Sequence, residues 1–350
     1  MIFKMQDYIS VLQRDIPSSL LSTEYADCMR RIGAQLPLVA FGFFEFWFGE
    51  CQSRVDLHVG IDRRLNENET VVTYLNRGNS EGAFAALESA IKKWSKLDQQ
   101  LWLFTQYFGL IYDIPDPSLQ SITPWYYITY NPSPLFANDV FFQGEVVLAI
   151  LKMLDESFSS SLQSEWERFF NNAFPAMRVN AIGFQASRQV EALRVALLFD
   201  RYSDINSFLE KNRWPGDFDE LYKQTDIVDG CDRYGLTIDV NPALQPKIGI
   251  ECFYDTPEAA RKGYKRLTDK LVERGLCTEA QQKAFLKWDG SFEMKNDPNS
   301  WSWPDKYKKL PHLIPATVSI KRAPRHLKVV YEPGRSIIAK GYLGYHKPLL

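Results

Sequence analysis

The chain contains AFGFFEFWFGE at residues 40–50 and, after a short polar turn, RVDLHVGI at residues 54–61. In the second piece apolar and polar side chains alternate strictly, which is the period-two pattern of a β-strand with two different faces. Two such strands joined by a short turn predict a β-hairpin. Helical patterns follow over Glu81–Ser95 and Leu97–Leu110, so the unit is a hairpin followed by a helix pair.

The same unit recurs along the rest of the sequence. Further strand pairs are expected at Arg178–Phe184 with Ala192–Phe199, at Tyr234–Val240 with Lys247–Phe253 and at Thr317–Lys321 with His326–Tyr331, and a last strand at Ile337–Tyr345. Helices are expected at Met5–Arg31, Glu145–Leu154, Ile205–Lys211, Phe218–Lys223, Pro257–Arg274 and Thr278–Trp288. The composition of Thr123–Tyr130 also predicts a strand, for which Asn138–Gln143 is the candidate partner.

The order of these elements restricts the architecture. Strands that arrive as hairpins do not build a parallel βαβ sheet, in which strands arrive singly, and they predict an antiparallel sheet with helices on one side. A twisted sheet of about ten strands rarely stays open. We therefore predict an α+β fold with a single domain over residues 1–350. It would be a closed antiparallel barrel of about ten strands ringed by helices. An open sheet used as an assembly surface is the alternative.

The composition excludes several classes of protein. The 350 residues carry 41 Lys and Arg against 43 Asp and Glu, so no overall positive charge attracts nucleic acid. The longest apolar run, Leu36–Phe44, is far shorter than the ~18 residues that cross a bilayer. The N-terminus lacks the pattern of a signal peptide, and the five cysteines are scattered. The sequence predicts a cytoplasmic protein without a nucleic-acid or membrane partner.

Polar side chains occupy the strand face opposite to the apolar set. In four of the predicted hairpins this face carries a cation near the start of the second strand: Arg54, Arg194, Lys247 and Lys328. In a closed barrel these cations converge, and burying them without compensation is costly. Their anionic partner is either a set of acids, Glu45, Asp56, Asp239 and Glu251, or a polyanionic ligand. A diphosphate suits a ring of Arg and Lys donors.

Repeated hairpin and helix-pair units, with cations on successive inner strand faces, resemble the aromatic prenyltransferases of the αββα-barrel (PT-barrel) kind. The resemblance covers nearly the whole chain. Glu45 stands where the indole-specific branch of that family has its base, and Arg54 stands where it has a diphosphate-binding arginine. Lys340-Gly-Tyr342 is similar to the Lys-x-Tyr pattern on the family's late inner strands. The family's lumen binds an isoprenyl diphosphate and an aromatic acceptor.

The resemblance implies an enzyme, an aromatic prenyltransferase of natural product biosynthesis. It would transfer an isoprenyl group from an allylic diphosphate to an indole or phenol, either a small molecule or a Trp or Tyr unit in a peptide. The implied residues are Glu45 as base or acceptor anchor, Arg54, Arg194, Lys247, Lys328, Lys340 and Tyr342 for the diphosphate, and Phe43, Trp47 and His58 for the acceptor and prenyl pocket.

Two points stay open on the same barrel. The reaction would need either no cofactor or Mg²⁺, for which Asp56 is the candidate ligand, although a salt bridge is the other role open to it. Lys247 is followed by Gly249 and Lys328 by Val330, where the family would place a tyrosine. This departure favours the alternative function, a non-catalytic binding protein for a peptide or an anionic metabolite.

Overall fold

The computed structural model describes residues 5–13, 15–36, 39, 41–49, 54–62, 71–72, 83–97, 104–120, 122–130, 140–154, 160–171, 177–184, 192–241, 243–295 and 317–346. Within these ranges the strands are β1 (Phe41–Trp47), β2 (Val55–Asp62), β3 (Thr105–Tyr112), β4 (Trp125–Tyr130), β5 (Arg178–Phe184), β6 (Leu193–Phe199), β7 (Arg233–Asn241), β8 (Ala243–Phe253), β9 (Gly290–Lys295), β10 (Thr317–Tyr331) and β11 (Ile338–His346).

The strands close into a ring. Every neighbouring pair is antiparallel, in the order β1-β2-β3-β4-β5-β6-β7-β8-β10-β11, and β11 pairs with both β10 and β1. Strand β9 stands outside the ring and pairs with the first half of β10. Among the described residues this gives a closed barrel of ten strands with one extra strand, so the predicted fold class is confirmed.

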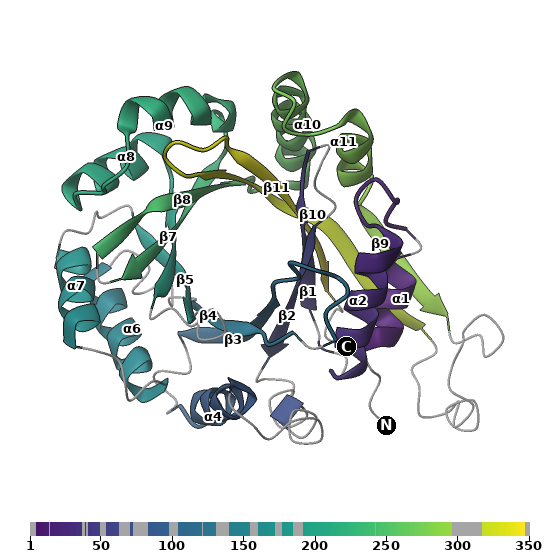
Figure 1. Cartoon of the computed structure of the whole chain (residues 1–350), viewed down its shortest axis with the longest axis horizontal. Coiled ribbons are helices and arrows are strands. Elements are labelled where there is room, and N and C mark those ends of the chain that lie inside the picture. The colour runs from purple at the N-terminus through teal and green to yellow at the C-terminus, as the bar shows by residue number, and fades with distance from the viewer. Residues whose placement is uncertain are drawn as a thin grey trace.

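Helices surround the barrel, as Figure 1 shows. They are α1 (Met5–Gln13), α2 (Thr23–Ala34), α4 (Ala83–Ser95), α6 (Val140–Leu154), α7 (Ser160–Asn171), α8 (Tyr202–Lys211), α9 (Phe218–Thr225), α10 (Pro257–Glu273) and α11 (Glu279–Leu286), with a short 3₁₀ turn at Asp226–Val228. Thr256 caps α10 by accepting a hydrogen bond from the amide of Ala259. None of the helices in the described ranges has the length and hydropathy of a membrane-crossing segment.

The main hydrophobic core lies between the outer strand faces and the helices. The outward side chains of β2, from Val55 to Ile61, are all essentially buried, and Phe44 and Phe46 on β1 are buried beside them. Because alternate residues of a strand point to opposite faces, the intervening polar residues must point into the barrel. The alternation in RVDLHVGI therefore predicts correctly which side chains face the helices and which face the lumen.

Two predictions around β3 and β4 are wrong. Residues of the expected helix Leu97–Leu110 form part of β3, which pairs with β2 and β4. Gly109 allows the Tyr127 ring of β4 to cover β3 at this point, because a Cβ atom there would lie 2.0 Å from that ring. Within the expected partner of β4, Asn138–Gln143, the described residues 140–143 belong to α6, and β4 pairs with β3 and β5.

Two further predictions differ at the ends of the chain. The expected helix Met5–Arg31 is two helices, α1 and α2. The structure describes residues 322–325 as part of a strand and not as the expected turn. Strand β10 continues through them with an irregularity between Pro324 and His326. Proline is tolerated in a strand at such an irregularity. The partner of the first half of β10 is β9, which the sequence pattern did not reveal. The Pro- and Trp-containing stretch Asn296–Lys306, whose composition predicts an ordered surface loop, lies outside the described residues.

Candidate functional site

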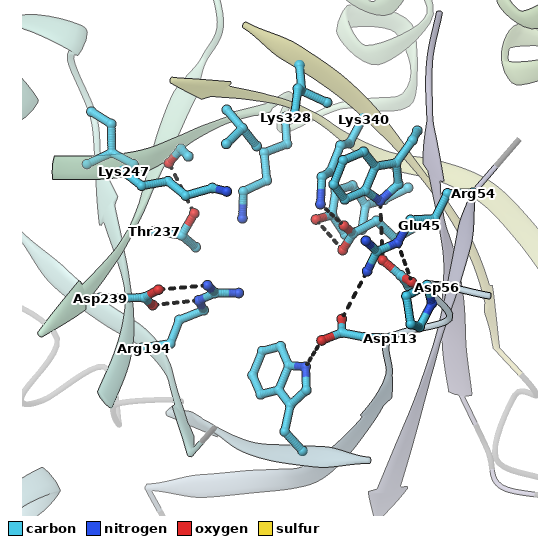
Figure 2. A pocket seen from close by; sticks show the side chains of 18 of the residues that line it. Glu45, Arg54, Asp56, Asp113, Arg194, Thr237, Asp239, Lys247, Lys328 and Lys340 are labelled. Atoms are coloured by element: carbon cyan, nitrogen blue, oxygen red, sulfur yellow. Dashed lines mark hydrogen bonds and ion pairs between the residues drawn. The ribbon is translucent and has the colours of Figure 1, made fainter. Parts of the chain in front are cut away.

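One cavity of about 590 Å³ lies inside the barrel (Figure 2). Inward-facing residues of β1, β2, β4, β6, β7, β8, β10 and β11 line it, and the segment between β3 and β4 contributes Asp113, Pro115, Leu119, Ile122 and Thr123. All five cations expected at the diphosphate site are on this wall: Arg54, Arg194, Lys247, Lys328 and Lys340. The phase of alternation on separate strands thus brings charges that are far apart in sequence into one space.

Each of these cations has a carboxylate partner. Arg54 Nε lies 3.2 Å from Asp56 Oδ1, and Arg194 forms two bonds to Asp239 of 2.7 and 2.9 Å. Lys328 Nζ lies 3.0 Å from Glu251 Oε1, Lys247 Nζ lies 3.1 Å from Glu332 Oε2, and Lys340 binds Glu45. The four acids named from the sequence therefore all hold a cation, and Glu332 completes the set.

Glu45 contacts three polar side chains of the barrel interior. Its Oε1 accepts a hydrogen bond from Lys340, while its Oε2 accepts one from the Tyr342 hydroxyl at 2.6 Å and lies 3.2 Å from His58 Nε2. Burial acts to raise the pKa of Glu45, but Lys340 and His58 outweigh it and hold that pKa well below its usual range. Glu45 is therefore a carboxylate at neutral pH, a weak base and a strong hydrogen-bond acceptor.

Asp56 serves the architecture of the cavity wall. Its Oδ1 accepts the amide of Ile114 at 2.7 Å and the guanidinium of Arg54, and its Oδ2 accepts the Trp47 indole N–H at 3.2 Å. Burial raises the pKa of this carboxyl group. Three donors engage its oxygens, and no group of three or more metal-ligating side chains occurs in the part of the chain that the structure describes. The salt bridge left open from the sequence is present.

Aromatic rings form two layers in the barrel. In the cavity wall Arg54 Cζ lies 4.5 Å and Lys340 Nζ 3.9 Å from the centroid of the Trp47 ring, so both cations lie over its π-system. Phe43 and His58 were expected in the same pocket, but neither lines the cavity. Their ring centroids lie 4.3 Å apart. Tyr342 joins the two layers, because it lines the cavity and its ring centroid lies 5.7 Å from that of Phe43.

Several residues of the wall were missed in the sequence. Asp113 accepts the indole N–H of Trp125 at 3.1 Å, and Trp125 lies 5.4 Å from the Arg194 guanidinium. Both flank the segment between β3 and β4. Because residues of β3 were predicted as a helix, this segment was not expected to line the barrel. Arg31 of α2 holds this segment by donating to the carbonyl of Pro117 at 2.5 Å. The strand-like composition of Thr123–Tyr130 was the available signal for Trp125.

The ring of antiparallel strands, the surrounding helices and the charged lumen define the PT-barrel fold, so the predicted resemblance is confirmed at the level of fold. Among solved structures, AnaPT from Neosartorya fischeri is similar with a TM-score of 0.55 at 11% identity, covering 99% of this chain and 94% of AnaPT. The prenyltransferase PriB, in a binary complex with product diphosphate, has a TM-score of 0.52 at 11% identity and coverage of 97% and 94%. No family model and no curated protein matches the sequence.

Proposed function

We propose that this protein transfers an isoprenyl group from an allylic diphosphate to an aromatic acceptor inside the barrel. The observation that carries the proposal is the convergence of five cations on one cavity that also holds Glu45 and aromatic faces. A cavity of about 590 Å³ is in the range of small-molecule sites. PriB, whose fold is similar, binds product diphosphate in one of its structures.

The reaction breaks the allylic C–O bond and forms a bond from that carbon to the acceptor, which then loses a proton. The departing diphosphate carries the electron pair of the broken bond, and preorganised cations such as Lys247 and Lys328 stabilise its charge. The allylic cation lies against an aromatic face, for which Trp47 and Trp125 are available on the wall. Glu45 accepts a hydrogen bond from the acceptor N–H or O–H as the ring gains positive charge.

This scheme uses no resident cofactor, and Mg²⁺, where needed, enters with the diphosphate as its counter-ion. The acceptor is an indole or phenol, as a free molecule or as a residue of a peptide. The cytoplasmic location expected from the sequence stays a prediction.

The test is product formation. The chain is incubated with dimethylallyl diphosphate, with and without Mg²⁺, and with tryptophan, indole, tyrosine and Trp- or Tyr-containing peptides, and products are detected by mass spectrometry. Lys328→Met removes a lumenal charge at similar volume, and Lys321→Met, an exposed position on the same strand, is the matched control. We expect product with wild type and the control and a large loss with Lys328→Met. Absence of both product and diphosphate binding would refute the proposal.

A second function is favoured by one observation, the pairing of every lumenal cation in the described structure with a carboxylate. A lumen whose cations are all paired also suits a binding protein for an anionic metabolite or a peptide. Calorimetric binding of a diphosphate without turnover of any acceptor would support this function.

A further inference from the structure

Each cation of the cavity wall already has a carboxylate partner before any ligand enters. Within the described residues the five lumenal cations each lie within hydrogen-bonding distance of a carboxylate, and a sixth acid, Asp113, lies 4.0 Å from Arg54. An allylic diphosphate is fully ionised above pH ~7.5 and then carries about three negative charges, because the second pKa of a phosphate ester is about 6. Its entry leaves the lumen with excess negative charge unless a positive charge enters too.

The excess negative charge acts on the Lys328–Glu251 pair. Lys328 lines the cavity, whereas Glu251 does not, and their side chains are 11% and 10% exposed. Glu251 packs against Gly235, where a Cβ atom would lie 2.9 Å from Glu251 Oε2. If the Lys328 ammonium turns to a phosphate, Glu251 is left as a buried carboxylate without its cation. Leaving one member of a buried ion pair uncompensated is strongly unfavourable.

His326 is the neighbour that can restore the balance. Its Nε2 lies 4.0 Å from Glu251 Oε2 and has no hydrogen-bond partner in the described part of the chain. The imidazole is stacked on Tyr342 at 3.9 Å and contacts Phe253 at 5.0 Å between centroids, so its position is fixed. Burial lowers the pKa of His326 to about 4, and the imidazole is therefore neutral at pH 7 in the protein without ligand.

The charged groups that face His326 come from three elements. Glu251 on β8 and Glu45 on β1 favour its protonated form, and Lys328 and Arg325 on its own strand oppose it. Tyr342 on β11 covers the ring as a neutral phenol, because burial raises the pKa of Tyr342. A ligand anion cancels the effect of Lys328 and leaves Glu251 and Glu45 dominant.

We propose that the cavity binds an allylic diphosphate together with one proton and that His326 is the group that takes the proton up. In the liganded state Lys328 contacts a phosphate oxygen, and protonated His326 replaces it as the partner of Glu251. The proposal rests on the proposed function, since it takes the anion to be the diphosphate of the prenyl donor. No covalent bond other than that of the proton to nitrogen changes.

The consequence is a dependence of affinity on pH. Where the bound state holds one proton more than the free protein, the dissociation constant rises up to tenfold for each pH unit. This regime begins near pH 4, the pKa of His326 in the free protein, and ends at its higher pKa in the complex. Measurements from pH 7.5 to 8.5 use a donor whose own phosphates are fully ionised, so the slope reports the protein.

The experiment is titration calorimetry of the full chain with dimethylallyl thiolodiphosphate, the analogue found in one PriB structure. At pH 7.5, with a chelator present, the titration is repeated in buffers of different ionisation enthalpy, which gives the number of protons taken up. We expect net proton uptake for wild type and for the control His346→Asn, an exposed position at the end of β11. We expect a value near zero for His326→Asn.

A second variant tests the same inference if His326→Asn does not fold. Glu251→Gln removes the carboxylate that needs the proton, so we expect its proton uptake to fall below half of the wild-type value and its affinity to depend less on pH. Wild-type binding with heats that do not depend on the buffer would overturn the inference and leave the donor site intact. Uptake that persists in His326→Asn would assign the proton to another group and also overturn it. No binding at any pH would overturn the proposed function itself.

Discussion

Replacing Glu45 by glutamine tests the centre of the site. The carboxylate accepts hydrogen bonds from Lys340, Tyr342 and His58, and its side chain is only 9% exposed. A glutamine amide turns its NH₂ group toward one of these donors, so at least one charge-assisted hydrogen bond is lost. Such a bond contributes about 1.5–3 kcal/mol. We expect unfolding free energy to fall by about 2–3 kcal/mol, because Lys340 is also left without its carboxylate.

A double variant separates stability from chemistry. Glu45→Gln with Lys340→Met removes both charges of the pair, so most of the lost stability should return. Activity should not return, because the acceptor has lost its hydrogen-bond anchor. If Glu45 acts in the rate-limiting step, turnover in both variants falls by a factor of about 10² to 10⁴.

The measurements are urea denaturation and single-turnover prenylation. The control is Glu279→Gln at an exposed position in the first turn of α11. Two results would refute the reasoning. A Glu45→Gln variant with wild-type stability would show that the three hydrogen bonds do not matter for folding. Comparable single-turnover rates in Glu45→Gln and wild type would leave the carboxylate with no part in the reaction.

Three other predictions follow from separate parts of the molecule. Lys247→Met should change unfolding free energy by under about 0.5 kcal/mol, since its pair with Glu332 is partly exposed, yet weaken diphosphate binding by about 1.5–3 kcal/mol in calorimetry. The lowered pKa of His326 means that stability is full above pH 6.5 and falls toward pH 4, and a thermal-unfolding series should show less acid sensitivity in His326→Phe. Gly109→Ala should lower stability by about 1–3 kcal/mol through the clash with Tyr127, and Tyr127→Leu in the same chain should restore part of it; an unchanged melting temperature in Gly109→Ala would contradict the register of β3 and β4.

The lumenal face of the barrel was predictable from the sequence where a strand alternates strictly. RVDLHVGI assigns Arg54, Asp56 and His58 to one face, and the structure places these side chains inside the barrel. The reason is physical, because one face of the strand packs on helices and must be apolar while the other is free to carry charge. The prediction that four separated cations converge needed only this alternation and ring closure.

The partners of those charges were beyond the sequence. Arg194 meets Asp239 because β6 and β7 are in a register that sets them directly opposite each other, and register is a property of pairing. The choice between internal acids and a ligand as the counter-charge could not be made without that register. Strand β3 was missed because a short apolar run has no clear period. The reason for a glycine at position 109 becomes clear only once it is placed opposite Tyr127.

The pairing of the lumenal cations sets a condition on any ligand that the barrel accepts. A diphosphate must compete with carboxylates that already hold the lumenal cations, so it gains less than it would from a ring of free cations. The gain is greatest where a cation is exposed enough to turn without stranding its partner, as Lys247 is at 46% exposure beside a partly exposed Glu332. It is smallest at Arg194, whose two bonds to Asp239 are a fixed bidentate pair. If the protein is a transferase, diphosphate affinity should therefore fall more in Lys247→Met than in Arg194→Met, whereas a larger loss in Arg194→Met would show that the Asp239 pair opens for the ligand.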